Sequence, residues 1–312
     1  MKAVQISQYG DVGVLNVTQD APRPTVDGGK VLVEVHAASV NPIDTTVRSG
    51  FYATMMPLTF PATLGTDFAG EVVEVDPGIK DFRKGDRVYG MASLLAGASG
   101  AFAQYAVVPV GMVARIPSGL SMSEAAALPL TAVSALEVID EKLKVGKGHK
   151  ILIHGGAGGI GTIAIQIAKH RGATVATTVM GEAVPYVQGL GADTAIDFQK
   201  ESFEKALSGY DFVFDTVAGE TYKKSFAVLK RGGIIISMLE QPNAELAAQH
   251  GVTALFQMTQ VTTARLNAVA ELVSNGTIKV HVDRVFPLEK AREAFLARES
   301  GKVRGKVVLS IR

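Results

Sequence analysis

Seven consecutive residues, Gly155 to Gly161, contain five glycines and lie between two runs of very different pattern. The run before them, "KILIH", is mostly apolar and typical of a buried strand, whereas "TIAIQIAKH" after them repeats at helical spacing. Backbone N–H groups left bare at the start of a helix, together with the positive end of the helix dipole, favour a phosphate group. The turn therefore predicts the binding of a phosphate-bearing ligand.

Residues 156–161 also match the spacing G-x-G-x-x-G of dinucleotide-binding turns. In that pattern Gly156 permits the tight turn, Gly158 lets a pyrophosphate approach the backbone, and Gly161 lets the helix pack closely on the strand. The alternative is a glycine-rich turn with a purely structural role, but the flanking strand and helix favour the dinucleotide. The predicted contacts are Gly156, Ala157, Gly158, Gly159, Ile160 and Gly161.

The end of the second predicted strand bears on which dinucleotide binds. Residues Thr177 to Met180 are neutral, and Glu182 follows slightly late for the acid that holds the ribose of NAD. The same short stretch contains no Lys or Arg for the additional phosphate of NADP. The residues themselves leave NADP and NAD open.

The elements that must position this turn fall into two patterns. Residues 1–120 show short alternating runs between Gly and Pro turns, which is typical of a mostly antiparallel β domain. From residue 121 to 275 strands and helices alternate, which predicts an α/β domain with a doubly wound parallel sheet of the Rossmann type. Residues 276–312 return to strand, helix and strand, and we expect them to complete the first domain.

Composition narrows the function classes. The 312 residues are 47% hydrophobic and 20% charged, as in a globular protein, and 31 basic residues nearly balance 30 acidic ones. A net charge of +1 argues against a nucleic acid or an anionic membrane as partner. The absence of cysteine excludes disulfides, thiolate metal sites and a cysteine nucleophile. No signal peptide and no membrane-spanning stretch is visible, so a cytoplasmic protein is expected.

These features resemble the medium-chain dehydrogenases/reductases, and in particular their zinc-independent quinone and enone oxidoreductases. The resemblance covers nearly the whole chain and implies a GroES-like catalytic domain beside a Rossmann nucleotide-binding domain. It is carried by the segments "VHAASVNPIDTTVRSG", "PATLGTDFAGEVVEV", "FRKGDRVYG", "AAALPLTAVSALEVI", "ILIHGGAGGIGTIAIQIAKHRGA", "LGADTAIDF", "YDFVFDTVAG" and "RGKVVL".

The positions of the zinc ligands in that superfamily differ here. The first stretch reads "NPID", with Asn41 and Asp44, and the stretch that is usually Gly-His-Glu reads Gly65-Thr66-Asp67. Without cysteine neither zinc site of the superfamily forms in its usual shape, and the histidines lack ligand spacing. We therefore predict no metal site, and a zinc-binding name for this chain would be inherited from relatives.

The resemblance also implies residues of the catalytic site, each with a simpler alternative. The amide of Asn41 would donate to a carbonyl, or Asn41 is a turn residue. Asp44 would orient Asn41 or a neighbour, or it caps a helix. Tyr52 would donate to an enolate or pack on the nicotinamide ring. Thr131 would lie beside the nicotinamide, or it has a structural role at a helix start.

Further cofactor contacts are predicted at the ends of the parallel strands, where ligands bind in such folds. The alternative for Met238 and Leu239 is that they belong to the hydrophobic core. The alternative for Lys306 is that it is an exposed lysine on a strand. His154, which precedes the glycine turn, is expected to pack or to bond the turn rather than to act in catalysis. The predicted contacts are Thr178, Asp215, Val217, Ser237, Met238, Leu239 and Lys306.

Without a Lewis acid the hydride acceptor must already be electrophilic, as quinones and α,β-unsaturated carbonyls are. The expected function is therefore reduction of such small molecules by hydride transfer. The resemblance further implies NADPH as the hydride donor, with NADH as a possible cofactor, and a homodimer as the assembly. Two alternatives stay open. One is a zinc-type alcohol dehydrogenase, and the other is an NADPH-binding sensor or structural protein without turnover.

Overall fold

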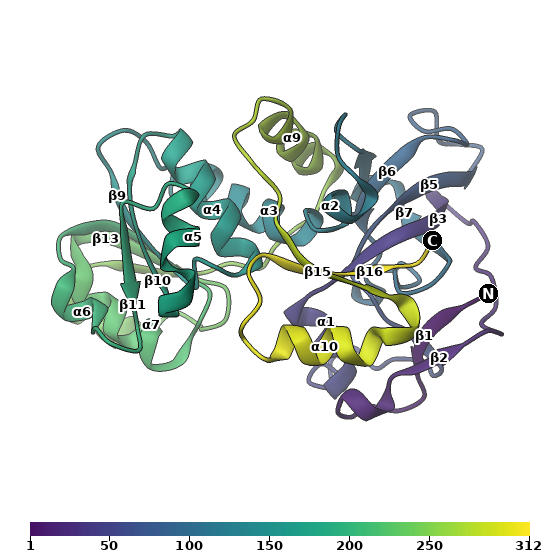
Figure 1. Cartoon of the computed structure of the whole chain (residues 1–312), viewed down its shortest axis with the longest axis horizontal. Coiled ribbons are helices and arrows are strands. Elements are labelled where there is room, and N and C mark those ends of the chain that lie inside the picture. Colours follow the sequence, from purple (N-terminus) through teal and green to yellow (C-terminus); the bar gives the residue numbers. More distant parts are fainter. The chain divides into compact units, whose positions relative to one another are not determined.

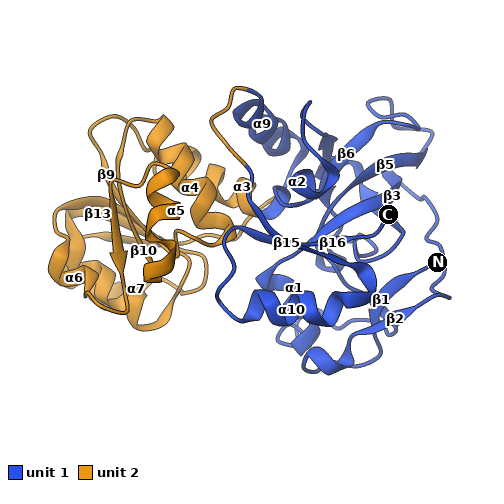
Figure 2. Ribbon diagram, viewed as in Figure 1, with its two compact units in different colours: residues 1–130, 261–274, 280–312 blue, residues 131–260, 275–279 orange.

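The computed structural model describes all 312 residues and divides into two compact units, which Figure 2 colours separately. Unit 1 comprises residues 1–130, 261–274 and 280–312, and unit 2 comprises residues 131–260 and 275–279. The chain thus begins and ends in unit 1, and the middle of the sequence forms most of unit 2.

Unit 2 is built on a sheet of six parallel strands in the order β11-β10-β9-β12-β13-β14. Ile151, Leu152 and Ile153 of β9 are fully buried, as expected for a strand covered on both faces. The strand order reverses between β9 and β12, so the predicted doubly wound sheet is confirmed. The strands are β9 (Lys150–His154), β10 (Thr174–Val179), β11 (Thr194–Asp197), β12 (Tyr210–Asp215), β13 (Leu229–Ser237) and β14 (Thr253–Phe256).

The helices of unit 2 connect these strands. Helix α4 (Gly159–His170) follows β9 and packs on β9 and β10, where Figure 1 shows it beside the sheet. Its buried side chains include Ile163, Ile167 and Ala168. The other helices are α3 (Pro129–Leu136), which crosses the unit boundary and continues as a π-helical turn (Glu137–Lys142), α5 (Val184–Gly189), α6 (Phe203–Ala206), α7 (Gly219–Ser225) and α8 (Ala244–His250).

Unit 1 is mostly β structure, as predicted. A seven-stranded sheet has the order β15-β16-β3-β5-β6-β8, with β7 also paired to β3, and a smaller sheet has the order β2-β1-β4. Phe68, Phe102 and Phe295 are fully buried in its core. The strands are β1 (Ala3–Ile6), β2 (Asn16–Thr18), β3 (Lys30–Val40), β4 (Ala62–Thr63), β5 (Asp67–Val75), β6 (Arg87–Met91), β7 (Tyr105–Pro109), β8 (Val113–Arg115), β15 (Val282–Pro287) and β16 (Lys306–Ser310).

The C-terminal strands belong to unit 1. Strand β16 pairs antiparallel with β3 and parallel with β15, so Figure 1 shows the two ends of the colour scale side by side in one sheet. The helices are α1 (Pro42–Ser49), α2 (Met122–Ala126), α9 (Thr263–Ser274) and α10 (Ala291–Glu299). No helix in either unit has the length and apolar character that crossing a bilayer requires.

The division of the structure differs from the predicted boundaries at two places. Helix α2, which Ser121 and Glu124 cap, packs on β3 and β5 and so lies in unit 1. Helix α9 also lies in unit 1, because Tyr89 donates to the carbonyl oxygen of Leu266 at 2.6 Å. The hydroxyl of Thr263 donates to two further carbonyl oxygens of unit 1. Helical pattern alone had placed both segments in the predicted 121–275 domain, whereas these contacts decide otherwise.

Candidate active site

The glycine turn of unit 2 is a loop of backbone with few side chains. Gly155 has φ +69°, in the left-handed region that favours glycine, so the sharpest bend lies one residue before the position that the motif predicts. Gly156 is needed for another reason, because a Cβ there would lie 2.0 Å from Oγ1 of Thr177. The N–H of Gly158 donates to the carbonyl oxygen of Gly155 at 2.9 Å and closes the turn.

Helix α4 begins directly at this turn. Its N-cap is Gly158, which supplies no side chain to the free N–H groups of the first turn. A Cβ on Gly158 would lie 3.3 Å from the nearest atom, whereas one on Gly161 would lie 2.3 Å from the carbonyl oxygen of Gly155. Gly161 therefore allows close packing of helix on strand, and the open N–H groups beyond Gly158 fit a pyrophosphate.

Thr178 and His154 stabilise the turn through hydrogen bonds. The side chain of His154 is fully buried, with Nδ1 at 2.9 Å from the hydroxyl of Thr178 and Nε2 at 2.8 Å from the hydroxyl of Ser225. The Thr178 hydroxyl also accepts from the N–H of Gly155 at 3.4 Å. Burial lowers the pKa of His154 to about 3, so the ring is neutral. The expected supporting role of His154 is confirmed.

Asp215 and Ser237 hold together the ends of β12 and β13. Asp215 is fully buried, and it accepts the hydroxyl proton of Ser237 at 2.7 Å and the N–H of Val217 at 3.0 Å. Ser237 in turn accepts the N–H of Leu239 at 3.1 Å. Val217 and Leu239 are exposed, so the core alternative is wrong for Leu239, while Met238 is half-buried. The two polar residues thus shape loops that present apolar side chains at the carboxyl ends of the strands.

An acidic group near the second strand was not predicted. Asp197 ends β11, and a Cβ on Gly181 would lie 2.4 Å from its Oδ2, so the carboxylate lies against the segment that follows β10. Lys200 pairs with Asp197 at 3.2 Å. The segment after the second strand, which reads as neutral in the sequence, is therefore approached by an acid at the end of β11, and that acid is paired with a lysine of the following turn.

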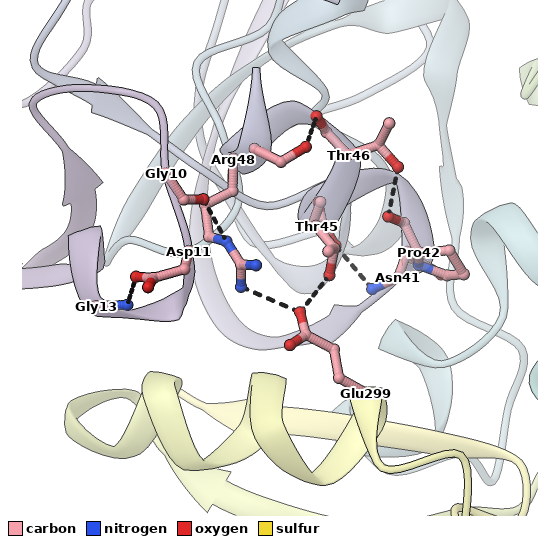
Figure 3. Close-up of polar contacts among 11 residues, drawn as sticks. Gly10, Asp11, Gly13, Asn41, Pro42, Thr45, Thr46, Arg48 and Glu299 are labelled. Carbon is pink, nitrogen blue, oxygen red and sulfur yellow. Dashed lines mark hydrogen bonds and ion pairs between the residues drawn. The ribbon is translucent and has the colours of Figure 1, made fainter. Parts of the chain in front are cut away.

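In unit 1 the segment that carries Asn41 and Asp44 is fixed at the start of helix α1. Asp44 accepts the N–H of Asn41 at 2.7 Å, so it does act at the helix start. Figure 3 shows the outer side of α1, where Glu299 of α10 accepts from Arg48 at 3.1 Å and from Thr45 at 2.9 Å. These contacts hold α1 on α10 and so fix the position of both predicted catalytic residues.

Asn41 and Asp44 belong to a larger group that we call the buried polar cluster: Ser39, Asn41, Asp44, Thr66, Asp67 and Lys306. The amide nitrogen of Asn41 donates to Asp67 at 2.8 Å, and its amide oxygen accepts from Lys306. Lys306 also donates to the carbonyl oxygen of Val40 at 3.1 Å. The alternative of an exposed strand lysine is therefore wrong, and Asn41 is oriented by partners on both sides.

The charges of the cluster are set mainly by burial. Burial raises the pKa of Asp44 to about 7, against the opposing hydrogen bond from Thr66. Burial also raises the pKa of Asp67 to about 6, although the Lys306 ammonium opposes this. The pKa of Lys306 falls to about 8, again through burial. Burial therefore brings the pKa of all three groups closer to neutrality.

Tyr52 and Thr131 are the other two predicted catalytic residues. Tyr52 follows α1, and its ring packs edge-on against exposed Phe51 with 5.2 Å between centroids. Thr131 is a buried residue of α3 and the first residue of unit 2. The two predicted residues therefore belong to different units.

The donor set of the chain does not fit a zinc ion. No three His, Cys, Asp or Glu side chains come together as a ligand group. Where two carboxylates do approach one another, in the buried polar cluster, the cation among them is the ammonium of Lys306, bonded to Asn41. Sequence analysis found Asn41, Asp44 and Lys306 one by one but missed the roles of Thr66, Asp67 and Ser39. The polar residues within the apolar stretches "AASVN" and "LGTDFAG" were the available signal.

Two family models match the sequence. The one described as alcohol dehydrogenase GroES-like domain matches residues 27–118, and the one described as zinc-binding dehydrogenase matches residues 190–309. Both names refer to the family and not to the ligand set of this chain.

Characterised relatives match along nearly the whole chain. The 2-methylene-furan-3-one reductase of Solanum lycopersicum is 37% identical, over 99% of this chain and 79% of the relative. The chloroplastic NADPH-dependent alkenal/one oxidoreductase of Arabidopsis thaliana is 36% identical with the same coverage.

Solved structures agree with this grouping. The quinone oxidoreductase of Coxiella burnetii has a TM-score of 0.90 at 35% identity, and covers 100% of this chain and 99% of its own. The Escherichia coli quinone oxidoreductase, solved in complex with NADPH, has a TM-score of 0.89 at 26% identity, with both chains covered completely.

Proposed function

The chain belongs to the medium-chain dehydrogenases/reductases of the quinone and enone oxidoreductase type, and we propose that it is an NADPH-dependent reductase of quinones or α,β-unsaturated carbonyls. When bound, NADPH supplies the hydride. The protein binds and orients both reactants and manages the charge that develops on the acceptor oxygen.

The glycine turn is the observation that carries this proposal. Its N–H groups are open at the start of a twelve-residue helix, and the neighbouring residues forbid side chains at Gly156 and Gly161. This supports the pyrophosphate contacts assigned to residues 156–161. The ends of β12 and β13 support further contacts at Val217, Met238 and Leu239, with Asp215 and Ser237 shaping those loops. Thr178 bonds the glycine turn itself. Lys306 lies in unit 1 and acts through Asn41.

The acceptor class follows from the donor set of unit 1. The buried polar cluster offers a hydroxyl, an amide and an ammonium but no group of metal ligands, so it supports acceptors that need no Lewis acid. Quinones and activated enones meet that condition, because the added electrons delocalise over a conjugated oxygen. We propose Asn41, Asp44, Tyr52 and Thr131 as the residues nearest the reaction.

We propose a homodimer as the assembly. Strand β14 is the edge of the parallel sheet, and an uncovered edge strand pairs readily with another chain. Exposed Leu255 and Met258 lie on and just after it, which supports an apolar contact there. We also propose the cytoplasm as the compartment, which cell fractionation tests against the chloroplast location of the Arabidopsis relative.

Calorimetry with NADPH and NADH, followed by an acceptor panel, tests the function. We expect NADPH to bind and to be oxidised in the presence of at least one quinone or enone. Binding without turnover of any acceptor would leave a sensor or structural protein, and turnover restricted to simple alcohols would favour an alcohol dehydrogenase.

A further inference from the structure

Shortly after strand β12 the chain has a backbone conformation that residues with a side chain rarely adopt. Ala218 has φ +73° and ψ −170°, a combination that glycine adopts freely and that strains a residue with a Cβ. Such strain persists only where neighbouring contacts hold the chain against it, and it is concentrated at ligand-binding segments. The contacts around Ala218 therefore indicate what this segment does.

The N–H groups around Ala218 are bonded on both sides. One oxygen of the buried carboxylate of Asp215 accepts the N–H of Val217 at 3.0 Å and the N–H of Ala218 at 3.1 Å. The next N–H, that of Gly219, donates to the carboxylate of Glu240 at 2.9 Å. Three consecutive N–H groups are thus bonded to carboxylates, so the backbone cannot turn here without breaking these bonds.

Thr216 bonds the same segment to the neighbouring strand. Its hydroxyl donates to the carbonyl oxygen of His154, the last residue of β9, at 2.8 Å. A Cβ on Gly155 would lie 2.9 Å from Oγ1 of Thr216 and 3.4 Å from Cγ2 of Val217. The bond of Thr216 therefore holds the segment directly against the first residue of the glycine turn.

Val217 lies where a sheet of this kind binds its ligand. The strand order reverses between β9 and β12, and ligands bind outside the carboxyl ends of the strands at such a reversal. The glycine turn follows the carboxyl end of β9, and Val217 follows that of β12. Its side chain is apolar and 48% exposed, although the backbone on both sides of it is bonded. Val217 is thus held open beside the turn and is not packed in the core.

We propose that Thr216 is a positioning residue for the dinucleotide. Its bond to β9 holds the strained segment 216–218 in the conformation that presents Val217 beside the pyrophosphate. The inference rests on the proposed reductase function. The strain at Ala218 and the bond of Thr216 oppose one another, so without the bond the chain relaxes at Ala218 and Val217 leaves the ligand. A glycine at position 218 would not need the bond, because it adopts the same conformation without strain.

Variants at positions 216 and 218 test this by calorimetry with NADPH. Thr216→Val keeps the shape of the side chain and removes the hydroxyl, which Thr216→Ser retains. If the segment keeps its wild-type conformation for about a tenth of the time in Thr216→Val, the NADPH Kd rises about 10-fold, whereas Thr216→Ser should bind as wild type does. Ala218→Gly should raise the midpoint of thermal unfolding by about 2 to 4 °C. Thr216→Val combined with Ala218→Gly should recover the wild-type Kd.

Lys144→Gly is the matched control for a gain in stability alone. Lys144 also has a positive φ, of +48°, but it precedes the amino end of β9, whereas the glycine turn follows the carboxyl end. Combined with Thr216→Val, it should raise the midpoint of unfolding without recovering the NADPH Kd. The proposal is wrong if Thr216→Val binds NADPH as tightly as wild type, or if Lys144→Gly restores affinity as fully as Ala218→Gly does.

Amide hydrogen exchange follows the segment without a ligand. The N–H groups of residues 217 and 218 should exchange faster in Thr216→Val than in wild type, and should return to the wild-type rate when Ala218→Gly is added. Unchanged exchange in Thr216→Val would contradict a segment held by Thr216. A wild-type protein that binds neither NADPH nor NADH would instead contradict the proposed function, and exchange would still show whether Thr216 holds the segment.

Discussion

Surroundings decide what a buried ionisable residue does in this chain. Asp44 and His154 are both almost inaccessible to solvent. His154 is bonded by two neutral hydroxyl groups and stays uncharged, with a pKa of about 3. Burial raises the pKa of Asp44 to about 7, although Thr66 and the N–H of Asn41 bond its carboxylate. The histidine therefore supports structure, and the aspartate has a protonation state that catalysis can use.

Replacing His154 tests the structural role. The unfolded histidine takes up a proton below about pH 6.5, whereas the folded one stays neutral to about 3, so wild-type stability falls as pH drops through that window. We expect His154→Gln to be less stable than wild type at pH 7, and the difference to shrink by about 2 kcal/mol at pH 5. Denaturant unfolding at the two pH values measures this, and a constant difference would contradict a neutral histidine in the fold.

The sequence predicted which residues belong to the site better than it predicted which of them contact one another. Asn41 and Asp44 lie only three positions apart in "NPID", and so both were found. Asp67 and Lys306 reach them only because β5 and β16 flank β3 in the sheet, a register that no local pattern reveals. The burial of Lys306 was missed for the same reason, since its partners are more than 260 residues away in the chain.

At the level of elements, the turn between β9 and α4 contributes to the stability of the fold and also to the proposed binding of the dinucleotide. The glycines serve different purposes that the motif alone does not separate. Gly156 and Gly161 leave room for other parts of the protein, whereas a Cβ on Gly158 would lie 3.3 Å from its nearest neighbour, and we propose that the pyrophosphate lies there. Substitutions at these positions should therefore have different consequences.

Gly158→Asp and Gly161→Ala form a matched pair. A side chain at 158 needs only a small shift, so the fold should persist while the carboxylate repels the pyrophosphate, and the NADPH Kd should rise by 10²-fold or more, equivalent to about 3 kcal/mol. A methyl group at 161 would collide with the backbone of Gly155, and we expect a lower midpoint of thermal unfolding. Calorimetry and thermal unfolding separate the two effects. Normal NADPH affinity in Gly158→Asp would contradict the assignment of this turn.

Element types followed from sequence periodicity where the runs were long. Strand β9 and helix α4 were predicted, because "KILIH" is mostly apolar and "TIAIQIAKH" repeats at helical spacing. Strand β14 was not, since "TALF" is short and follows a polar helix. Its place at the edge of the sheet depends on pairing with β13 and not on its own pattern.

In the whole molecule, each of the two units contains a different group of residues that the proposed reaction requires. Unit 2 contains the glycine turn, and unit 1 contains the buried polar cluster. Unit 1 depends on both ends of the chain, because β16 lies between β15 and β3 and also carries Lys306. Strand β14 is the edge of the sheet in unit 2, where we propose that a second copy pairs.

Leu255→Lys tests the proposed dimer. A charge on an edge strand opposes pairing with another strand, so we expect light scattering to show a monomer where wild type is a dimer. Leu296→Lys changes another exposed leucine, on α10 of unit 1, and should leave the dimer intact. A dimer that survives Leu255→Lys would place the interface elsewhere.

The most direct test of the whole account follows NADPH and acceptor together. Purified protein is mixed with NADPH and a quinone or enone, with and without a strong metal chelator, and both products are quantified. We predict one reduced acceptor for each NADPH oxidised, at a rate that the chelator leaves unchanged. Loss of activity on chelation, or no oxidation of NADPH with any acceptor, would contradict a reductase that works without a metal.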